Sequence, residues 1–133
     1  MISAVDSSVL LDVLLNDPTY GKQSARLLQD AYDAGGLIVS EIVYAEIASQ
    51  FDSQQTLDSA LAQMNIRVVC STRETAFIAG QKWWQYRKAG GTRTRLLADF
   101  LIGAHARVHA EQLLTRDRGF YRQYFSDLPL LEE

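Results

Sequence analysis

The amino-acid sequence predicts an α/β fold in which a central parallel sheet is covered by helices on both faces. Short apolar runs, each long enough for one strand, alternate along the chain with longer segments of helical periodicity. These runs are mostly apolar, which is typical of strands covered on both faces. With 133 residues, of which 47% are hydrophobic, the chain has the length and apolar content of one domain, residues 1–133.

The first strand is expected over Ile2–Val5, and Asp6 follows it at the turn into a helix. Ser7 and Ser8 are candidate caps of this helix, which carries apolar residues at helical spacing as far as Leu14. Asp6 is therefore expected at the carboxyl end of a buried strand.

A second helix is expected over 20–34, between the break at Asn16-Asp17-Pro18 and the pair Gly35-Gly36. The apolar run 37–39 predicts the second strand, and Ser40 is the expected cap of the next helix. The later elements are expected in this order: a helix over 41–50, a helix over 54–64, a strand over 66–69, a helix that opens at Thr72 and ends at Gly90-Gly91, a polar connector over 92–95, a helix that contains Asp99, a strand over 113–115, a turn over 116–119, a short helix over 120–125 and an edge strand over 128–131.

The composition excludes a membrane protein and a disulfide scaffold. No apolar run is long enough to span a membrane, and residues 1–6 lack the basic start and apolar core of a signal peptide. The single cysteine, Cys70, cannot form a disulfide within the chain, and its neighbours Val68 and Val69 predict a buried thiol. We therefore expect a cytoplasmic protein.

Basic residues are concentrated toward the C-terminal end of the chain. Between Lys82 and Arg122 lie nine of the thirteen Lys and Arg residues and three acidic residues, a net charge of +6. Because the whole chain carries −3, the remainder carries −9. A basic region on an acidic protein is typical of a surface that binds phosphate groups, although a solvated helix face has the same composition.

The helix around Asp99 is apolar on one face and lined with small residues on another, so it is expected to pack on more than one side. An ionised carboxylate on such a helix costs free energy unless it meets a cation or hydrogen-bond donors. The ordinary alternative is an acid in the first helical turn that interacts with the helix dipole, which contributes about 0.3–1 kcal/mol.

Three further carboxylates are expected at the same edge of the sheet as Asp99. Asp6 follows the first strand, Glu46 lies on the helix after the second, and Asp117 follows the strand 113–115. In open parallel sheets, ligands bind at the carboxyl ends of the strands, where the chain direction across the sheet reverses. Four carboxylates there repel one another unless cations bind between them. Oxygen ligands favour Mg²⁺ or Mn²⁺, which activates water and stabilises charge on a phosphate.

Each candidate also has a structural alternative. Asp6 is a possible helix cap, Glu46 a solvent-facing acid and Asp117 an Asx-turn residue. Thr115 is expected either to contribute its hydroxyl to metal-bound water or simply to close its strand.

Two histidines and two serines are weaker candidates. His105 and His109 have the spacing of a zinc-binding pair, but residue 106 is Ala where the metalloprotease pattern has Glu, so we expect no zinc site. Ser7 and Ser8 lack a nearby histidine in the sequence that would act as a base, so we expect them to cap a helix.

Four segments resemble, in order, the motifs of PIN-domain proteins, and most closely those of the VapC toxins of prokaryotic toxin–antitoxin pairs. They are VDSSVLL over 5–11, SEIVYAE over 40–46, ADFLIGAHA over 98–106 and LLTRDRGFY over 113–121. The resemblance spans the whole chain and implies a three-layer α/β/α fold and Mg²⁺- or Mn²⁺-dependent endoribonuclease activity. It also implies a homodimer and inhibition by a cognate antitoxin whose tail enters the active-site groove.

By the same resemblance, the residues of the metal site are Asp6, Glu46, Asp99 and Asp117, with Ser8 and Thr115 as auxiliaries. Glu41 precedes Glu46 by five residues, about 140° around a helix, so either is a candidate for the inward acid, and the Tyr-Ala-Glu context favours Glu46. The side chains expected to contact RNA are Arg93, Arg95, Arg116 and Arg118.

Other classes of α/β protein fit less well. A haloacid-dehalogenase-type phosphatase needs a second Asp two residues after Asp6, where this chain has Ser8. A receiver domain needs a Lys late in the sheet, and no Lys follows Lys88. The remaining alternative is a non-catalytic PIN module that binds metal and RNA as an interaction protein.

Overall fold

The computed structural model describes residues 1–92 and 96–131. The described residues form four strands, namely β1 (Ile2–Val5), β2 (Gly36–Val39), β3 (Ile66–Val68) and β4 (Gln112–Leu114). They also form seven helices, namely α1 (Ser7–Leu14), α2 (Gly21–Ala34), α3 (Glu41–Ala48), α4 (Gln54–Gln63), α5 (Arg73–Lys88), α6 (Leu97–His109) and α7 (Arg118–Tyr124). The alternation of strands and helices expected from the sequence is therefore confirmed.

The strands form one parallel sheet in the order β3-β2-β1-β4. The central strand β1 pairs with β2 through Ser3 and Leu37 and with β4 through Ala4 and Leu113. The first three strands follow one another in one direction, and β4 then lies on the other side of β1. The carboxyl ends of β1 and β4 are consequently the place where the topology reverses, which is the usual ligand site of such sheets.

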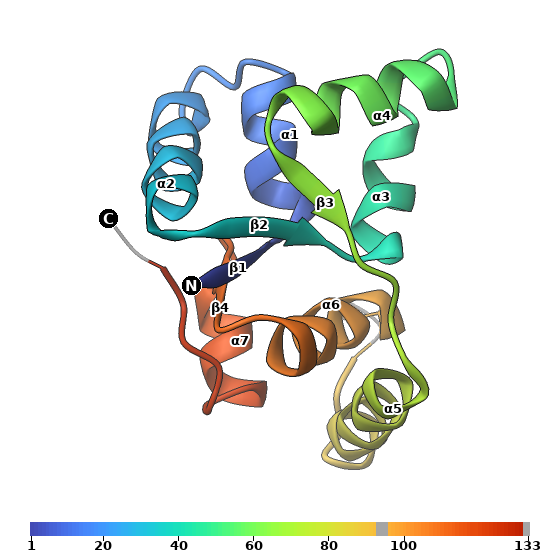
Figure 1. Ribbon diagram of the computed structural model, residues 1–133. Coiled ribbons are helices and arrows are strands. Elements are labelled where there is room, and N and C mark those ends of the chain that lie inside the picture. The colour runs from blue at the N-terminus through green and yellow to red at the C-terminus, as the bar shows by residue number, and fades with distance from the viewer. Residues whose placement is uncertain (93–95, 132–133) are drawn as a thin grey trace.

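The helices cover the two faces of the sheet in two groups. Helices α1 to α4 lie on one face and α5 to α7 on the other (Figure 1). Right-handed connections that lead in opposite directions across a parallel sheet place their helices on opposite faces, so the reversal at β1 explains the two groups. The fold is thus the three-layer α/β/α arrangement expected from the sequence.

Side-chain caps start several of the helices where the sequence predicts them. The hydroxyl of Ser40 accepts a hydrogen bond from the Val43 N–H at 3.2 Å, and that of Thr72 accepts one from the Thr75 N–H at 3.4 Å. Helix α1 differs from the prediction, because Asp6 occupies the cap position and the helix begins at Ser7. The serine hydroxyls at the start of α1 are therefore available to the Asp6 carboxylate.

An aromatic cluster packs α6 against its neighbours. The Phe100 ring is fully buried and lies 5.6 Å from the Tyr86 ring of α5 and 5.1 Å from the Phe120 ring of α7, between centroids. At Gly103, a Cβ atom would lie 2.5 Å from the ring of Phe125, so the glycine permits this close packing. The cluster holds the helix that carries Asp99 against the sheet.

Two expectations about the sheet edges are wrong. Cys70 is exposed rather than buried, because β3 is an edge strand whose Val68 is itself 42% exposed. The segment 128–131 forms a single parallel bridge, from Leu113 to Leu130, rather than a strand. Its backbone nevertheless covers the outer edge of β4, since the Leu113 N–H donates to the Pro129 carbonyl at 2.9 Å.

Within the described ranges, no helix has the length and apolarity that crossing a membrane requires.

Candidate active site

Asp6 lies where β1 ends and α1 begins, beside the end of β4. Its backbone N–H donates to the Leu114 carbonyl at 2.9 Å, which continues the pairing of the two strands. Its carboxylate accepts three hydroxyl hydrogen bonds, from Thr115 at 2.7 Å, Ser8 at 3.3 Å and Ser7 at 3.4 Å. Only 6% of the residue is exposed. Asp6 is therefore a buried acid whose carboxylate is held by neighbouring hydroxyls.

Burial raises the pKa of Asp6 above its ordinary value of 3.8. The hydrogen bonds from Thr115, Ser7 and Ser8 act in the opposite direction because they favour the ionised form, and the charge of Asp99 raises the pKa further. The net effect is a raised pKa. The folded protein thus holds this carboxylate in surroundings that disfavour its charge.

Of the two candidate acids on α3, Glu46 is the one on the side of Asp6, although the residue is exposed. The Ser7 hydroxyl lies 3.0 Å from Glu46 Oε1, and partial burial, followed by the charges of Asp6 and Asp99, raises the pKa of Glu46. Glu41 instead accepts a hydrogen bond from the Ser71 N–H at 2.7 Å. Burial alone would raise the pKa of Glu41, but hydrogen bonding to Ser71 lowers it. Within α3, Glu46 is therefore the acid whose charge interacts with Asp6.

Asp99 lies at the start of α6, and its charge also acts on two of the other acids. Its Oδ2 atom accepts a hydrogen bond from the Leu96 N–H at 3.0 Å, so it satisfies a backbone donor at the start of α6. Its charge also raises the pKa of Asp6 and Glu46, which places it close to both. The helix-terminus role accordingly does not remove Asp99 from the acidic cluster.

Tyr121 is a buried residue on which all four acids act electrostatically, and the sequence analysis did not identify it. The residue is 2% exposed, and its hydroxyl lies 3.5 Å from the Asp99 carbonyl. Burial raises the pKa of Tyr121, and the charges of Asp6, Asp99, Asp117 and Glu46 raise it further. The charges of all four predicted acids therefore act on one buried side chain. Its position one helical turn after Asp117 is the sequence feature that could have identified it.

Thr115 connects Asp6 to the segment after β4. Its fully buried hydroxyl donates to Asp6 Oδ2 and accepts a hydrogen bond from the Asp117 N–H at 3.0 Å. Asp117 itself occupies the cap position of α7 and is half-buried. One hydroxyl thus links the carboxyl ends of β1 and β4.

The donor atoms of the cluster fit a hard divalent cation, since all of them are carboxylate or hydroxyl oxygens. In residues 1–92 and 96–131, however, no group of three or more His, Cys, Asp or Glu side chains is arranged so that it could hold a metal ion. Over the same residues, no Lys or Arg forms an ion pair with Asp6, Glu46 or Asp99. Among the described residues, the repulsion between Asp6, Glu46 and Asp99 is therefore not balanced by an ion pair with a basic side chain.

The two histidines of α6 contact different partners. His105 Nε2 lies 2.6 Å from the Val69 carbonyl, and His109 Nε2 lies 3.3 Å from the Thr75 hydroxyl. Burial lowers the pKa of His105, which favours its neutral form. These contacts tie α6 to the segments around α5.

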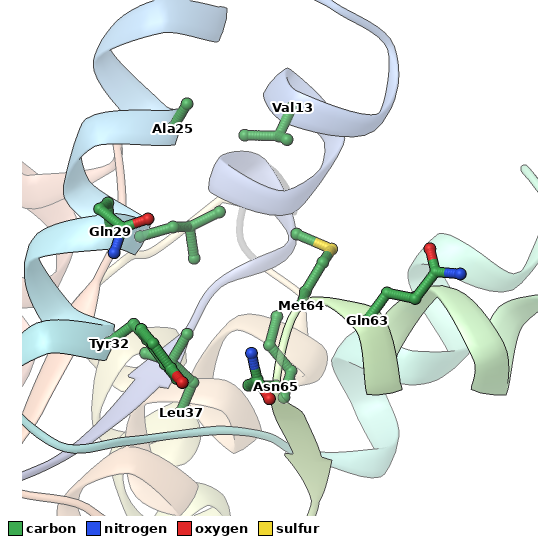
Figure 2. A pocket seen from close by; sticks show the side chains of 10 residues that line it. Val13, Ala25, Gln29, Tyr32, Leu37, Gln63, Met64 and Asn65 are labelled. Atoms are coloured by element: carbon green, nitrogen blue, oxygen red, sulfur yellow. The ribbon is translucent and has the colours of Figure 1, made fainter.

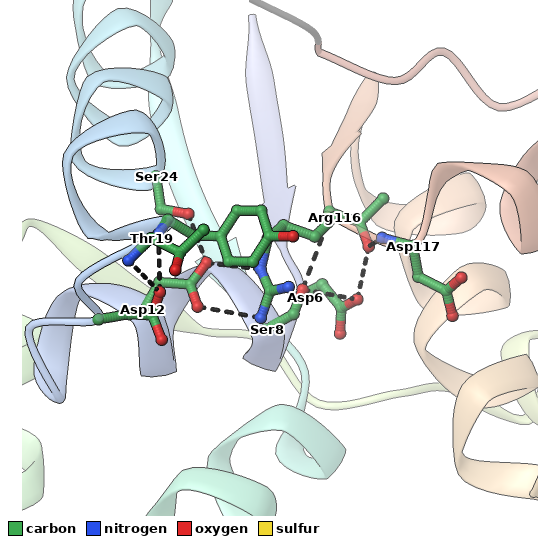
Figure 3. Close-up of polar contacts among 10 residues, drawn as sticks. Asp6, Ser8, Asp12, Thr19, Ser24, Arg116 and Asp117 are labelled. Carbon is green, nitrogen blue, oxygen red and sulfur yellow. Dashed lines mark hydrogen bonds and ion pairs between the residues drawn. The ribbon is translucent and has the colours of Figure 1, made fainter.

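The four predicted RNA-binding arginines differ in their placement. Arg93 and Arg95 lie outside the described residues. Arg116 donates two hydrogen bonds to Asp12, from Nε at 2.7 Å and from Nη2 at 3.0 Å, as Figure 3 shows. Arg118 begins α7 and is half-buried, and its Nε has no hydrogen-bond partner among the described residues.

A separate pocket of about 260 Å³ lies near the amino ends of β2 and β3. Side chains from α1, α2 and the turn between α4 and β3 line it, including Val13, Tyr32 and Met64 (Figure 2). Its lining contains no acidic residue. The pocket is therefore distinct from the carboxylate cluster, which lies at the opposite ends of the strands.

A family model, described as the PIN domain, matches residues 4–126 of this chain. The chain belongs to the PIN domain family. The matched residues include Asp6, Glu46, Asp99 and Asp117, so the whole acidic cluster lies within the PIN domain. No curated protein matches the sequence significantly.

Solved structures share the fold of this PIN domain over nearly its full length. VapBC-1 from nontypeable Haemophilus influenzae has a TM-score of 0.72 at 20% identity and covers 99% of this chain and 98% of its own. VapBC2 from Rickettsia felis, bound to a DNA fragment from its promoter, has a TM-score of 0.69 at 19% identity, with 98% of each chain covered. VapC20 from Mycobacterium tuberculosis, a sarcin–ricin-loop-cleaving toxin, has a TM-score of 0.58 at 16% identity and covers 89% of this chain and 93% of its own. The fold is thus that of the VapC toxins.

Proposed function

We propose that this PIN domain is a divalent-metal-dependent endoribonuclease that acts as the toxin of a toxin–antitoxin pair. One observation carries the proposal. The charges of four carboxylates from four separate segments act on the buried Tyr121 near the place where the sheet topology reverses, and the pKa of two of them, Asp6 and Glu46, is raised. Perturbed carboxylates gathered at such a place are typical of catalytic sites.

The electrostatics of the cluster explain why a cation is expected. Burial and the charge of Asp99 both disfavour the ionised form of Asp6, so the cluster lowers the stability of the protein at neutral pH. A divalent cation held by Asp6 and Asp99 would offset this cost by favouring their ionised forms. Metal binding is therefore the simplest reason for four acids to share one site.

The proposed roles follow from the position of each side chain. Asp6 and Asp99 would hold the ion, and Glu46 and Asp117 complete the site. A bound Mg²⁺ or Mn²⁺ supplies an activated water and stabilises negative charge on a phosphate. Glu46 is suited to accept a proton from the attacking water, because its pKa is raised toward neutrality.

Two hydroxyls support this arrangement. Thr115 fixes Asp6 Oδ2 through a 2.7 Å hydrogen bond, and Ser8 donates to the same oxygen at 3.3 Å. Both hydrogen bonds favour the ionised carboxylate, which is the form that binds a cation.

RNA is the proposed substrate. The segment between Lys82 and Arg122 carries a net charge of +6, and Asp99 and Asp117 lie within it. This positive charge favours binding of the phosphate groups of RNA. Arg93, Arg95 and Arg118 are the proposed phosphate contacts.

A cognate antitoxin, a second copy of the chain and a cytoplasmic location complete the proposal. The similar structures from Haemophilus influenzae and Rickettsia felis are named as VapBC complexes, which supports an antitoxin as partner. Light scattering at micromolar concentration checks the oligomeric state, and the mass of a monomer would contradict the dimer.

A non-catalytic module is the second candidate. The observation that favours it is that residues 1–92 and 96–131 contain no group of three or more ligands arranged as a catalytic metal centre requires, which leaves at most weaker metal binding by fewer ligands. Such a module would bind metal and RNA without cleaving the RNA. The experiment that separates the two candidates is therefore a cleavage assay.

The assay uses total RNA and purified, antitoxin-free protein, with Mg²⁺, with Mn²⁺ and with a chelator. We expect discrete fragments that require the metal and that disappear with Asp99→Asn, because Asn removes one charge and keeps the shape. Asp30→Asn, an exposed acid on α2, is the matched control and leaves cleavage unchanged. Intact RNA in every condition, with a folded protein, would favour the non-catalytic module.

A further inference from the structure

Arg116 occupies the position between two residues of the acidic site, Thr115 and Asp117. Its guanidinium group nevertheless contacts Asp12 of α1 and Tyr20 at the start of α2. Figure 3 shows Arg116 facing Asp12, while the Asp117 side chain points in another direction. The side chain of Arg116 is 37% exposed, whereas that of Asp12 is 4% exposed. Arg116, in the segment after β4, thus directs its charged side chain toward the buried Asp12.

The contact between Arg116 and Asp12 is a bidentate ion pair. Nε and Nη2 of Arg116 lie 2.7 Å and 3.0 Å from the two Asp12 oxygens. Asp12 Oδ2 also accepts a hydrogen bond from the buried Ser24 hydroxyl of α2 at 2.7 Å. The guanidinium carbon lies 4.1 Å from the centre of the Tyr20 ring. These contacts fix both the position and the orientation of the guanidinium plane.

The same short segment is also attached to the acidic site. The Arg116 N–H lies 3.4 Å from the Ser8 hydroxyl oxygen, and Ser8 in turn donates to Asp6. Thr115 donates to Asp6 and accepts from the Asp117 N–H. Segment 115–117 is therefore held at two points, through Thr115 to Asp6 and through Arg116 to Asp12 on α1.

This geometry gives the ion pair a consequence for the acids. Without the two hydrogen bonds from Arg116, segment 115–117 would no longer be attached to Asp12. The hydroxyl contacts to Asp6 would remain. Thr115 and Asp117 could then shift relative to Asp6 and Asp99. A displacement of about 1 Å at a catalytic site lowers the rate by as much as a hundred-fold.

We propose that Arg116 is a positioning residue, which with Asp12 sets Thr115 and Asp117 relative to Asp6, rather than a contact to RNA. The inference rests on the proposed nuclease function and replaces the role expected for Arg116 from the sequence. A positive charge paired with a buried carboxylate carries little net field, so Arg116 contributes little to phosphate binding.

The test uses Arg116→Lys, which keeps the positive charge and loses the bidentate fork. The substrate is an RNA fragment taken from those that the wild-type protein cuts in total RNA. We expect kcat to fall between about ten-fold and a hundred-fold while KM stays within about two-fold. RNA binding is measured between 50 and 200 mM salt in the Asp99→Asn background, and its salt dependence stays unchanged.

The matched control is Arg107→Lys. Arg107 pairs with Asp127 at 3.0 Å, and both side chains are largely exposed, at 41% and 54%. The same substitution in an ion pair remote from the acids leaves kcat unchanged.

Asp12→Asn is the second variant, since it keeps the shape and hydrogen-bonding oxygen of Asp12 and lowers kcat as Arg116→Lys does. It decides the outcome if Arg116→Lys does not fold. In the double variant, the loss equals that of the more severe single variant, as expected for partners in one contact.

Three outcomes would overturn the inference. A raised KM with a flatter salt dependence and unchanged kcat would show that Arg116 binds RNA. A lower melting temperature with unchanged kcat in both variants would show that the pair only stabilises the fold. If the wild-type protein cuts no RNA, the proposed function fails first, and the inference falls with it.

Discussion

Replacing Thr115 with valine removes one buried hydroxyl and keeps the shape of the side chain. The hydroxyl makes two hydrogen bonds, one to the Asp6 carboxylate at 2.7 Å and one from the Asp117 N–H at 3.0 Å. A hydrogen bond to a charged group contributes about 1.5–3 kcal/mol, and one between neutral groups about 0.5–1.5 kcal/mol. We therefore expect Thr115→Val to lower the free energy of unfolding by about 2–4 kcal/mol at pH 7.

The loss should depend on pH in a definite direction. The bond from Thr115 favours the ionised form of Asp6, so its removal is most costly where Asp6 is charged. The pKa of folded Asp6 is raised above 3.8. The difference between the variant and the wild-type protein consequently shrinks as the pH falls from 7 through that raised pKa toward 3.8.

The assay is urea unfolding followed by circular dichroism, at several pH values. Thr75→Val is the matched control, because Thr75 is also fully buried and its hydroxyl contacts the Thr72 hydroxyl and His109 rather than a carboxylate. We expect it to lose about 1 kcal/mol. An equal loss from both substitutions at pH 7, or a Thr115→Val loss that does not change with pH, would refute the assigned contact to an ionised Asp6.

Two further predictions concern Asp6 and Gly103. Asp6→Asn should raise the melting temperature at pH 7. Because the pKa of folded Asp6 is raised, the wild-type protein loses stability as the pH rises through that pKa, and the variant avoids this loss. The gain should vanish below pH 3.8, where Asp6 is protonated in both the folded and the unfolded chain. A lower melting temperature at pH 7 would contradict the burial argument. Gly103→Ala should lower the free energy of unfolding by about 1–3 kcal/mol, since the new Cβ would lie 2.5 Å from the Phe125 ring. Gly80→Ala on α5 meets no atom within 4 Å and should instead be neutral or stabilising in the same unfolding measurement.

The order of strands and helices was predictable because it depends on local patterns. The runs that form β1 and β2 are buried on both faces and are apolar in sequence, so each could be recognised from a few residues. The edges of the sheet were not predictable in this way. Val68 and Cys70 belong to an apolar run like the others, but the run lies at an edge, and edge position depends on which strands pair.

The candidate site was predictable in its acids but not in its contacts. Asp6 and Asp117 follow recognisable strands, and the topology of a parallel sheet then places them at one edge. The choice between Glu41 and Glu46 depended on how α3 is rotated against the sheet, which the sequence of α3 alone does not determine. The pairing of Arg116 with Asp12 joins residues 104 positions apart, so neither side chain carried a local sign of it.

The pairing of the first strand with the last has a consequence for the timing of activity during synthesis. Asp6 is made among the first residues, but its partner Thr115 follows 109 residues later. A nascent or truncated chain that ends before β4 lacks Thr115 and Asp117 and cannot assemble the acids. The side chains that line the pocket, from Val13 to Ile66, leave the ribosome earlier. Translation therefore completes this surface before the acidic site, and the proposed activity can begin only after β4 and Asp117 have been made.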